Sequence, residues 1–313
     1  MHAAAFSPRG GVSPRSARLR GQSIIEYVLI IAVIGLVIVF AGPGVAGAIR
    51  NQFSQVTNTV DSGTDGGNFM SAEEKAYQEA MKTVVNKDAK DWTLDEQKAA
   101  ATDIAKNGTS SVVYAKAKAA MEAGTKYSAK LTNGKTLEYR IVGINHDDLA
   151  DGSGKAGLTF EATNTVLGTQ RMNATQTNAG GWEQSELRGR LNSGDLWSLL
   201  PSELQSKVKT VKKMTDNKGG GTAGTPSATT DKVFLLSTTE VYGNLQSDGA
   251  QYEYYTSKGV SKSSYSGASS GHSHWTRSVG PGISTGFRYV FSNGDYYNGN
   301  ATSASCVFPA FSF

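Results

Sequence analysis

The sequence has little cysteine and little proline, and each shortage restricts the structures it can form. Cys306 is the single cysteine among 313 residues, so the fold has no internal disulfide. One thiol also excludes a zinc site built on several cysteines. Proline occurs 7 times against 36 glycines, a balance that favours a body rich in loops and β-strands.

Motifs that carry chemistry are also scarce. No P-loop and no His-Glu-x-x-His motif occurs. His272 and His274 have no third ligand at a suitable spacing, and the acids Asp147, Asp148 and Asp151 lack the spacing of an EF-hand loop. The sequence therefore predicts no enzyme activity, no metal site and no cofactor.

Acidic residues are absent from the N-terminal region, where the whole charge excess of the chain lies. No acid precedes Glu26, whereas Arg9, Arg15, Arg18 and Arg20 all come before it. Removing these four from the 31 basic residues leaves 27, which equals the 27 acidic residues. The rest of the chain is thus formally neutral, which argues against a nucleic-acid partner. The basic excess is typical of the cytoplasmic flank of a membrane segment.

One long apolar run is present, over residues 24–41, and Glu26 is its only charge. As a helix it would span about 27 Å, close to the hydrocarbon thickness of a bilayer. The upstream arginines predict that the leader stays in the cytoplasm and that the part after Ala41 is exported. Three interpretations compete: an uncleaved anchor, a secretory signal cut after residues 46–48, and a prepilin.

Four residues favour the prepilin interpretation, namely Gly21, Gln22, Glu26 and Tyr27. Together they resemble the processing site of type IV-like prepilins, most closely the Flp (tight-adherence) branch. The resemblance implies that a prepilin peptidase cuts between Gly21 and Gln22. It also implies that Glu26 of one subunit pairs with the α-ammonium group of Gln22 on its neighbour. An ionisable group in a membrane segment costs several kcal/mol unless it has such a partner, so its presence suggests a function.

The sequence pattern in the body of the chain changes at about residue 126. Residues 51–125 read as a polar stalk followed by alanine-rich helical stretches, and Ser71 with Glu74 has the form of a capping box. Beyond residue 126, short β-like runs alternate with glycine, asparagine and serine. Residues 137–144 alternate as a half-buried strand does, and residues 231–237 predict a buried strand.

Residues 126–313 resemble a domain of uncharacterised function that is common in exported proteins of Gram-positive bacteria. The resemblance implies a mixed α+β body with long loops, similar to the C-type-lectin and formylglycine-generating-enzyme type of fold. The enzyme activity is not carried over, because it uses paired cysteines. The motifs that carry the resemblance are Gly180-Gly181-Trp182-Glu183-Gln184-Ser185-Glu186-Leu187-Arg188, Leu191-Asn192, Leu196-Trp197, Leu200-Pro201-Ser202, Asp231 to Ser237, Glu240-Val241, Gln251-Tyr252-Glu253-Tyr254-Tyr255, Trp275-Thr276-Arg277-Ser278 and Phe308-Pro309-Ala310-Phe311.

Candidate ligand-binding residues are aromatic or arginine side chains within this domain. Tryptophan and arginine dominate recognition surfaces, but signature tryptophans of a small domain often serve packing, which we favour here. Tyrosines set among glycine, serine and asparagine suit a sugar or peptide ligand and equally suit an ordinary β-rich surface. The candidates are Trp182, Arg188, Trp275, Arg277, Tyr254 and Tyr296.

The sequence as a whole predicts an α+β chain with a long N-terminal hydrophobic helix, a short helical spacer and a C-type-lectin-like globular domain. The expected function is a pilin-like surface subunit of a type IV/Flp filament that displays an adhesive domain. The alternative is a membrane-tethered extracellular ligand-binding protein that does not polymerise.

The expected partners are prepilin peptidase, other pilin subunits, membrane lipid before assembly, and a surface glycan or protein, with no nucleic acid. The expected location is the cell membrane, in a single pass, and then the cell surface. The predicted parts are a basic leader (1–21), a transmembrane and assembly helix (22–50), a stalk and spacer (51–125) and the exported domain (126–313).

Overall fold

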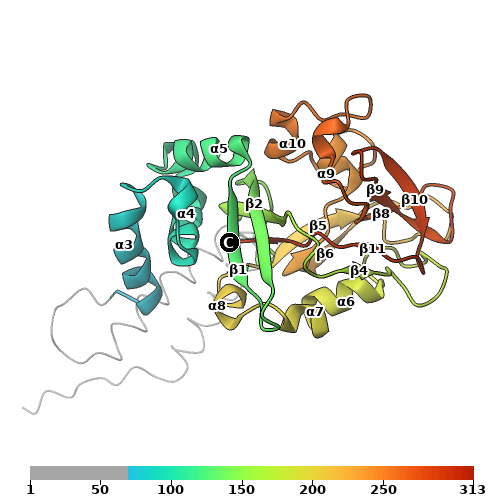
Figure 1. Cartoon of the computed structure of the whole chain (residues 1–313), viewed down its shortest axis with the longest axis horizontal. Helices are drawn as coiled ribbons and strands as arrows, with labels where there is room; N and C mark the ends of the chain where they lie inside the picture. The colour runs from blue at the N-terminus through green and yellow to red at the C-terminus, as the bar shows by residue number, and fades with distance from the viewer. Residues whose placement is uncertain (1–69) are drawn as a thin grey trace, which may run out of the picture. The chain divides into compact units, whose positions relative to one another are not determined.

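The computed structural model describes residues 70–313, which form an α+β body with three β-sheets (Figure 1). The predicted leader and the predicted hydrophobic helix over 22–50 lie outside the described residues. Within residues 70–313 the first helix is α3 (Ala72–Val84), and no helix is long and apolar enough to cross a membrane. The predicted fold class, in which a long apolar helix leads a lectin-like domain, is therefore wrong. The described chain instead begins with short helices that pack on a sheet.

Local sequence signals explain where these first helices begin. Helix α3 starts after Ser71, whose hydroxyl accepts a hydrogen bond from the Glu74 N–H at 3.0 Å. Helix α4 starts with a full capping box, in which Thr93 and Glu96 each accept a hydrogen bond from the other's backbone N–H. The helices and turns of this segment are α3, η1 (Ala89–Asp91), α4 (Leu94–Asn107), η2 (Gly108–Ser110) and α5 (Tyr114–Ala123).

The same helices share one hydrophobic core with the first sheet. Trp92 and Ile104 are buried in the cluster that also holds Phe160 of the sheet. Gly157 lets helix α4 approach closely, because a Cβ there would lie 1.8 Å from the carbonyl oxygen of Ala101. The segment that the sequence predicts to be a spacer therefore packs, from α3 onward, as part of the globular body.

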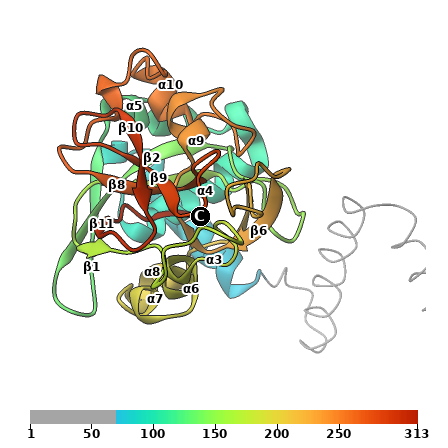
Figure 2. The same ribbon diagram turned by 90° about the vertical axis from the view of Figure 1, so that its right-hand side faces the viewer.

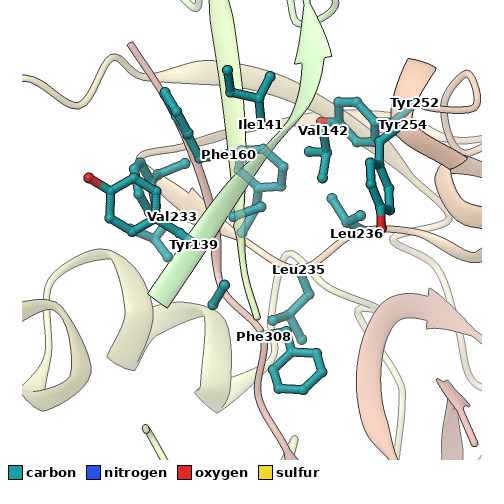
Figure 3. Close-up of a cluster of buried hydrophobic side chains, with 14 of the residues drawn as sticks. Tyr139, Ile141, Val142, Phe160, Val233, Leu235, Leu236, Tyr252, Tyr254 and Phe308 are labelled. Atoms are coloured by element: carbon teal, nitrogen blue, oxygen red, sulfur yellow. The ribbon is translucent and has the colours of Figure 1, made fainter. Parts of the chain in front are cut away.

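The first sheet places the C-terminal strand of the chain in its interior. Its strand order is β1-β2-β3-β12-β7, and β12 pairs antiparallel with both β3 and β7. Residues of β2 alternate, so that Tyr139 and Ile141 point into the core beside Phe160 (Figure 3). The rings of Tyr139 and Phe160 meet edge to face at 5.5 Å. The strands are β1 (Lys126–Lys130), β2 (Thr136–Ile144), β3 (Leu158–Ala162), β7 (Val233–Phe234) and β12 (Ala310–Ser312).

The second sheet has the order β10-β9-β8-β11-β4, and a separate two-stranded ribbon consists of β5 and β6. Strands β8, β9 and β10 form an antiparallel meander, and β11 joins it through one parallel pair with β8. The strands are β4 (Thr169–Gln170), β5 (Val211–Thr215), β6 (Ser227–Asp231), β8 (His274–Val279), β9 (Gly286–Val290), β10 (Tyr296–Asn300) and β11 (Ser305–Cys306).

Short helices connect the sheets. Helices α6, α7 and α8 lie together at one side of the body, whereas α9 and α10 lie at the opposite side, as both views show (Figures 1 and 2). Helix α9 packs against β8 and β9, so its first turn faces the interior of the second sheet. The remaining helices are α6 (Glu186–Asn192), α7 (Asp195–Ser198), α8 (Ser202–Gln205), α9 (Thr238–Tyr242), α10 (Glu253–Ser257) and η3 (Ser266–Ala268).

Candidate functional site

The residues predicted to act in processing and assembly cannot be placed. Gly21, Gln22, Glu26 and Tyr27 lie outside the described residues. The cleavage and assembly roles assigned to them stay predictions. The six candidate ligand-binding residues all lie within residues 70–313, and the structure distributes them among separate environments.

Trp182 and Arg188 meet at one buried carboxylate. The Trp182 indole is fully buried, and its N–H donates to Asp231 Oδ2 at 3.2 Å. The Arg188 guanidinium donates through Nε to Asp231 Oδ1 at 2.6 Å. Ser185, in turn, caps the helix that carries Arg188. Trp182 thus has no surface available to a ligand, and its contacts join the turn before α6 to strand β6.

Arg277 lies at the centre of a second buried cluster. Its side chain has no exposed surface, and both ends of its guanidinium bind the carboxylate of Glu240, which starts helix α9. It also donates to the carbonyl oxygen of Asp248 at 2.8 Å. Burial raises the pKa of Glu240, but the charges of Arg277 and Lys213 outweigh burial and hold that pKa below its ordinary value. Arg277 is therefore bound to the protein on every side.

Tyr254 belongs to a third cluster, around Arg140. The Arg140 guanidinium lies over the Tyr254 ring at 4.0 Å and donates to its hydroxyl at 3.0 Å. The same guanidinium binds Glu161 at 3.0 Å. Tyr254 is 7% exposed, so it presents little surface to solvent. The three clusters together contain four of the six candidates, and none of those four lies on an open aromatic surface.

Trp275 and Tyr296 lie on opposite faces of the meander β8-β9-β10. Trp275 is paired across the strands with Tyr289, and Tyr289 is paired with Tyr297. Since neighbouring side chains of a strand point to opposite faces, Tyr296 faces away from these three. Tyr296 packs at 5.1 Å against Tyr242, on the side covered by helix α9.

The face that holds Trp275 carries a cluster of three aromatic rings, two exposed and one half-buried, which we call the aromatic face: Phe291, Tyr297 and Tyr289. Phe291 is 40% exposed and Tyr297 is 50% exposed. Their ring centroids lie 5.6 Å apart, and the Tyr289 ring lies 6.4 Å from that of Tyr297. Trp275 supports Tyr289 from below at 5.9 Å. Exposed aromatic rings held side by side on a rigid sheet are typical of a binding surface.

A cavity of about 240 Å³ opens beside the aromatic face. Gly299 in its lining lets the Trp275 ring pack closely against β10, because a Cβ at this position would lie 2.9 Å from that ring. The Trp275 indole N–H donates to the carbonyl oxygen of Gln170 at 2.7 Å, which fixes the ring at the cavity wall. No charged side chain lines the cavity; its lining residues are Ser273, Trp275, Tyr289, Gly299, Ser303, Ala304 and Ser305.

The acids and histidines weighed as metal ligands have other partners. Asp147 binds Lys213 at 2.5 Å, and Asp148 binds Lys155 at 2.9 Å. His274 is buried against Phe308, and burial lowers its pKa to about 4. Within residues 70–313, no group of three or more histidine, cysteine, aspartate or glutamate side chains is arranged to hold a metal ion.

Residues 267–271 have the form Gly-x-Ser-x-Gly, but they do not form a nucleophile elbow. Ser269 follows the turn η3 rather than joining a strand to a helix. Its hydroxyl donates to the carbonyl oxygen of Ser292 at 2.7 Å. Neither the local geometry nor this hydrogen bond activates the serine as a nucleophile.

Comparison with known protein families gives one match, to a model described as "Domain of unknown function (DUF6273)" over residues 156–313. The chain belongs to the DUF6273 family. The match covers strands β3, β7 and β12 of the first sheet and all of the second, and so includes the aromatic face and its cavity. No curated protein and no solved structure matches the chain.

The family match corrects the two resemblances drawn from the sequence. It identifies DUF6273 and neither a pilin family nor a signal-peptide family, so the assignment to Flp-type prepilins is wrong. The likeness to the C-type-lectin and formylglycine-generating-enzyme fold is likewise unsupported, since no solved structure matches. What the sequence shows at residues 24–41 is an apolar run with one acid, a pattern that is not specific to one family.

Sequence reasoning also missed residues that the structure brings together. Tyr289 and Phe291 were not singled out, although the alternation of Tyr289, buried Val290 and Phe291 at the end of strand β9 puts both rings on one side. Lys213 was not singled out either. It bridges Asp147 and Glu240 in the interior, and no sequence spacing reveals such a contact.

Proposed function

We propose that the DUF6273 body of this chain is a binding domain for a neutral carbohydrate, with the aromatic face and its cavity as the site. The supporting observation is the exposed pair Phe291 and Tyr297, which lies with the half-buried Tyr289 beside an uncharged cavity. A sugar ring has an apolar C–H face that packs on aromatic rings, and its hydroxyls need hydrogen-bond partners at the edge. Serine hydroxyls line the cavity next to the rings.

The charge of the site distinguishes between ligand classes. An anionic ligand, such as a nucleic acid or an acidic polysaccharide, requires lysine or arginine at the contact. The cavity lining holds neither. Asp295 lies beside the face, and its hydrogen bond with the Tyr297 hydroxyl raises the pKa of that hydroxyl above its ordinary value. The site therefore suits a neutral ligand whose binding changes little with salt concentration.

Tyr297→Ala and Phe291→Ala test this site. Binding of the purified chain to an array of neutral and acidic polysaccharides is measured first, and the affinity for the best neutral glycan is then compared among variants. Each truncation is expected to weaken binding roughly tenfold, since one aromatic contact contributes about 1–1.5 kcal/mol. Met214→Ala and Val112→Ala are matched controls, because both residues are exposed apolar side chains outside the site.

Three outcomes contradict the proposal. The first is that the chain binds no neutral glycan, and the second is that it binds only acidic glycans or peptides. The third is that the double variant of Tyr297 and Phe291 binds as tightly as the natural chain. Unchanged binding by the two controls, together with loss in the two site variants, supports the aromatic face as the contact surface.

Display of this domain on a surface filament stays a prediction, because it rests on residues outside those described and no family match supports it. The N-terminal residue of the surface-exposed protein tests it by mass spectrometry. Gln22 as the first residue supports the prediction, whereas Met1 or Ile49 contradicts it. Glu26→Ala is expected to leave cleavage intact and abolish filaments seen by electron microscopy, since the unpaired ammonium group would oppose assembly. A non-polymerising tether would be indifferent to this change.

A further inference from the structure

Lys213, Asp147 and Glu240 form a buried triad that is distinct from the aromatic face. The Lys213 ammonium lies 2.5 Å from Asp147 Oδ1 and 2.6 Å from Glu240 Oε1. The three side chains are 3%, 2% and 2% exposed. They come from strand β5, from the loop after β2 and from the first turn of α9, so the tertiary fold alone brings them together.

The surroundings of the triad exclude water. The Phe234 ring lies 4.4 Å from the Lys213 nitrogen, and the Tyr252 ring lies 5.2 Å from it. Arg277 binds the Glu240 carboxylate from the other side, so Glu240 remains neutralised whatever happens to Lys213. An amine and a carboxyl group are thus held in contact at a dry site, with a second carboxylate next to the amine.

Donors also surround the Asp147 carboxyl in an arrangement that would activate it. Oδ2 accepts hydrogen bonds from the Thr159 hydroxyl at 2.6 Å and from the Tyr252 hydroxyl at 2.8 Å. Burial and the Asp147 charge raise the pKa of Tyr252 well above its ordinary value, so this hydroxyl stays protonated and donates. Negative charge that develops on Oδ2 during an attack at the carboxyl carbon would be stabilised by both donors, as in an oxyanion hole.

We propose that Lys213 and Asp147 condense to an intramolecular amide bond, with Glu240 as the group that transfers the protons. One proton passes from the ammonium to the Asp147 carboxylate, and the neutral amine attacks the carboxyl carbon. Glu240 takes a second proton from the attacking nitrogen and delivers it to Oδ1, which leaves as water. One C–N bond forms and one C–O bond breaks, and Oδ2 becomes the amide oxygen. The ion pair becomes a neutral amide plus one water, so atoms and charge balance without any co-reactant.

The resting state and the product fit the same geometry. Burial raises the pKa of Asp147, but the charges of Lys213 and His146 outweigh burial and bring it to about 2, so the pair rests as ions. Condensation proceeds from the small fraction of molecules in which the amine and the carboxyl group are both neutral. Because the two groups are held in contact, their effective concentration is about 10⁵ M or more, which offsets this low population. The product leaves Glu240 paired with Arg277, and the amide joins two positions 66 residues apart.

Peptide mapping of the full chain tests the bond. After denaturation and digestion with trypsin, we expect a branched peptide joining residues 141–155 to residues 213–218, lighter by one water than the two separate peptides. The branched peptide is the decisive signal, because Asp151-Gly152 can also lose water within one linear peptide. Recovery of only the linear peptide 141–155, together with residues 214–218 released by cleavage after an unmodified Lys213, would overturn the proposal. This measurement uses the natural chain and needs no variant to fold.

Two variants then separate the role of Glu240 from a general effect on β5. Glu240→Gln is expected to reduce the branched fraction at least tenfold, because the glutamine cannot transfer protons. Lys212→Arg, at the exposed neighbouring position of the same strand, is expected to leave the branched peptide at its natural level. A branched peptide formed as fully in Glu240→Gln as in the natural chain would overturn the assignment of Glu240. The test is independent of carbohydrate binding, which the amide neither requires nor abolishes.

Discussion

Arg277→Ala is expected to lower the free energy of unfolding by about 3–5 kcal/mol, because it leaves the Glu240 carboxylate buried without the guanidinium that neutralises it. The change also removes donors from the carbonyl oxygens of Leu235 and Asp248. For a domain of this size, such a loss corresponds to a fall in melting temperature of roughly 10 °C. Urea denaturation of the natural and variant chains, followed by tryptophan fluorescence, measures it.

A second bidentate pair in the same molecule provides the control. Arg190 binds Asp195 through two hydrogen bonds of 2.9 and 2.8 Å, a geometry like that of Arg277 and Glu240. Its side chains are 35% and 64% exposed, so water screens the pair and Arg190→Ala should cost only about 0–1 kcal/mol. If Arg277→Ala and Arg190→Ala lower the free energy of unfolding equally, burial does not make the difference that we assign to it.

A double variant separates lost charge from lost packing. If the weaker charge compensation at Glu240, which keeps only Lys213 at 2.6 Å, dominates the cost, then Glu240→Gln added to Arg277→Met should recover part of the stability lost in Arg277→Met alone. The recovery will be incomplete, since the carbonyl oxygens that Arg277 serves remain without their donor. If the double variant recovers no stability, then the packing of the Arg277 side chain, rather than its charge, accounts for the loss.

Local elements of the fold could be predicted where the sequence pattern matches the period of the element. Alternation over residues 137–144 corresponds to strand β2, and the alanine-rich stretch 94–106 corresponds to helix α4. Residues 231–237 were expected to form one buried strand. The structure ends β6 at Asp231, forms the two-residue buried strand β7 over Val233–Phe234, and begins helix α9 after Ser237. An apolar run reports burial, but it does not report whether the backbone continues in one strand.

The partners of the buried charges could not be predicted. Arg277 on β8 and Glu240 on helix α9 are 37 residues apart, and Lys213 lies on the separate ribbon β5-β6. Their contact depends on how the ribbon β5-β6 packs against the second sheet, which no local spacing encodes. Arg277 was therefore considered as a binding residue, although the interior of the fold satisfies it. Ser237 and Glu240 form a capping box, and their spacing of three residues is a local pattern that places Glu240 in the first turn of α9.

The same limit applied to the aromatic face. The sequence analysis selected Tyr296 as a candidate, but its neighbour Tyr297 faces the opposite side of the sheet, as adjacent residues of a strand do. Only the register of β10 against β9 shows that Tyr297 joins Tyr289 while Tyr296 packs under helix α9. A surface to which three strands contribute can be recognised only when the pairing of those strands is known.

Trp182→Ala should destabilise the chain by about 3–5 kcal/mol, through a cavity at a fully buried ring. Trp182→Phe should cost less, because it keeps much of the packing and loses the hydrogen bond to Asp231. Asp231 would still be held by Arg188 at 2.6 Å and by Thr229 at 2.5 Å.

The comparison with Trp197 decides whether Trp182 supports the structure or binds a ligand. Trp197 is only partly buried and lies under the Lys232 ammonium at 4.3 Å, so Trp197→Ala should cost less stability than Trp182→Ala. If Trp182 braces the turn, Trp182→Phe will retain full glycan binding below its melting temperature, which combined unfolding and binding assays can show. A phenylalanine variant that is as stable as the natural chain but no longer binds would instead place this indole at the ligand. The burial of the Trp182 ring and the bond of its N–H to Asp231 predict the first result, since a ring enclosed on every side reaches a ligand only if the turn before α6 opens.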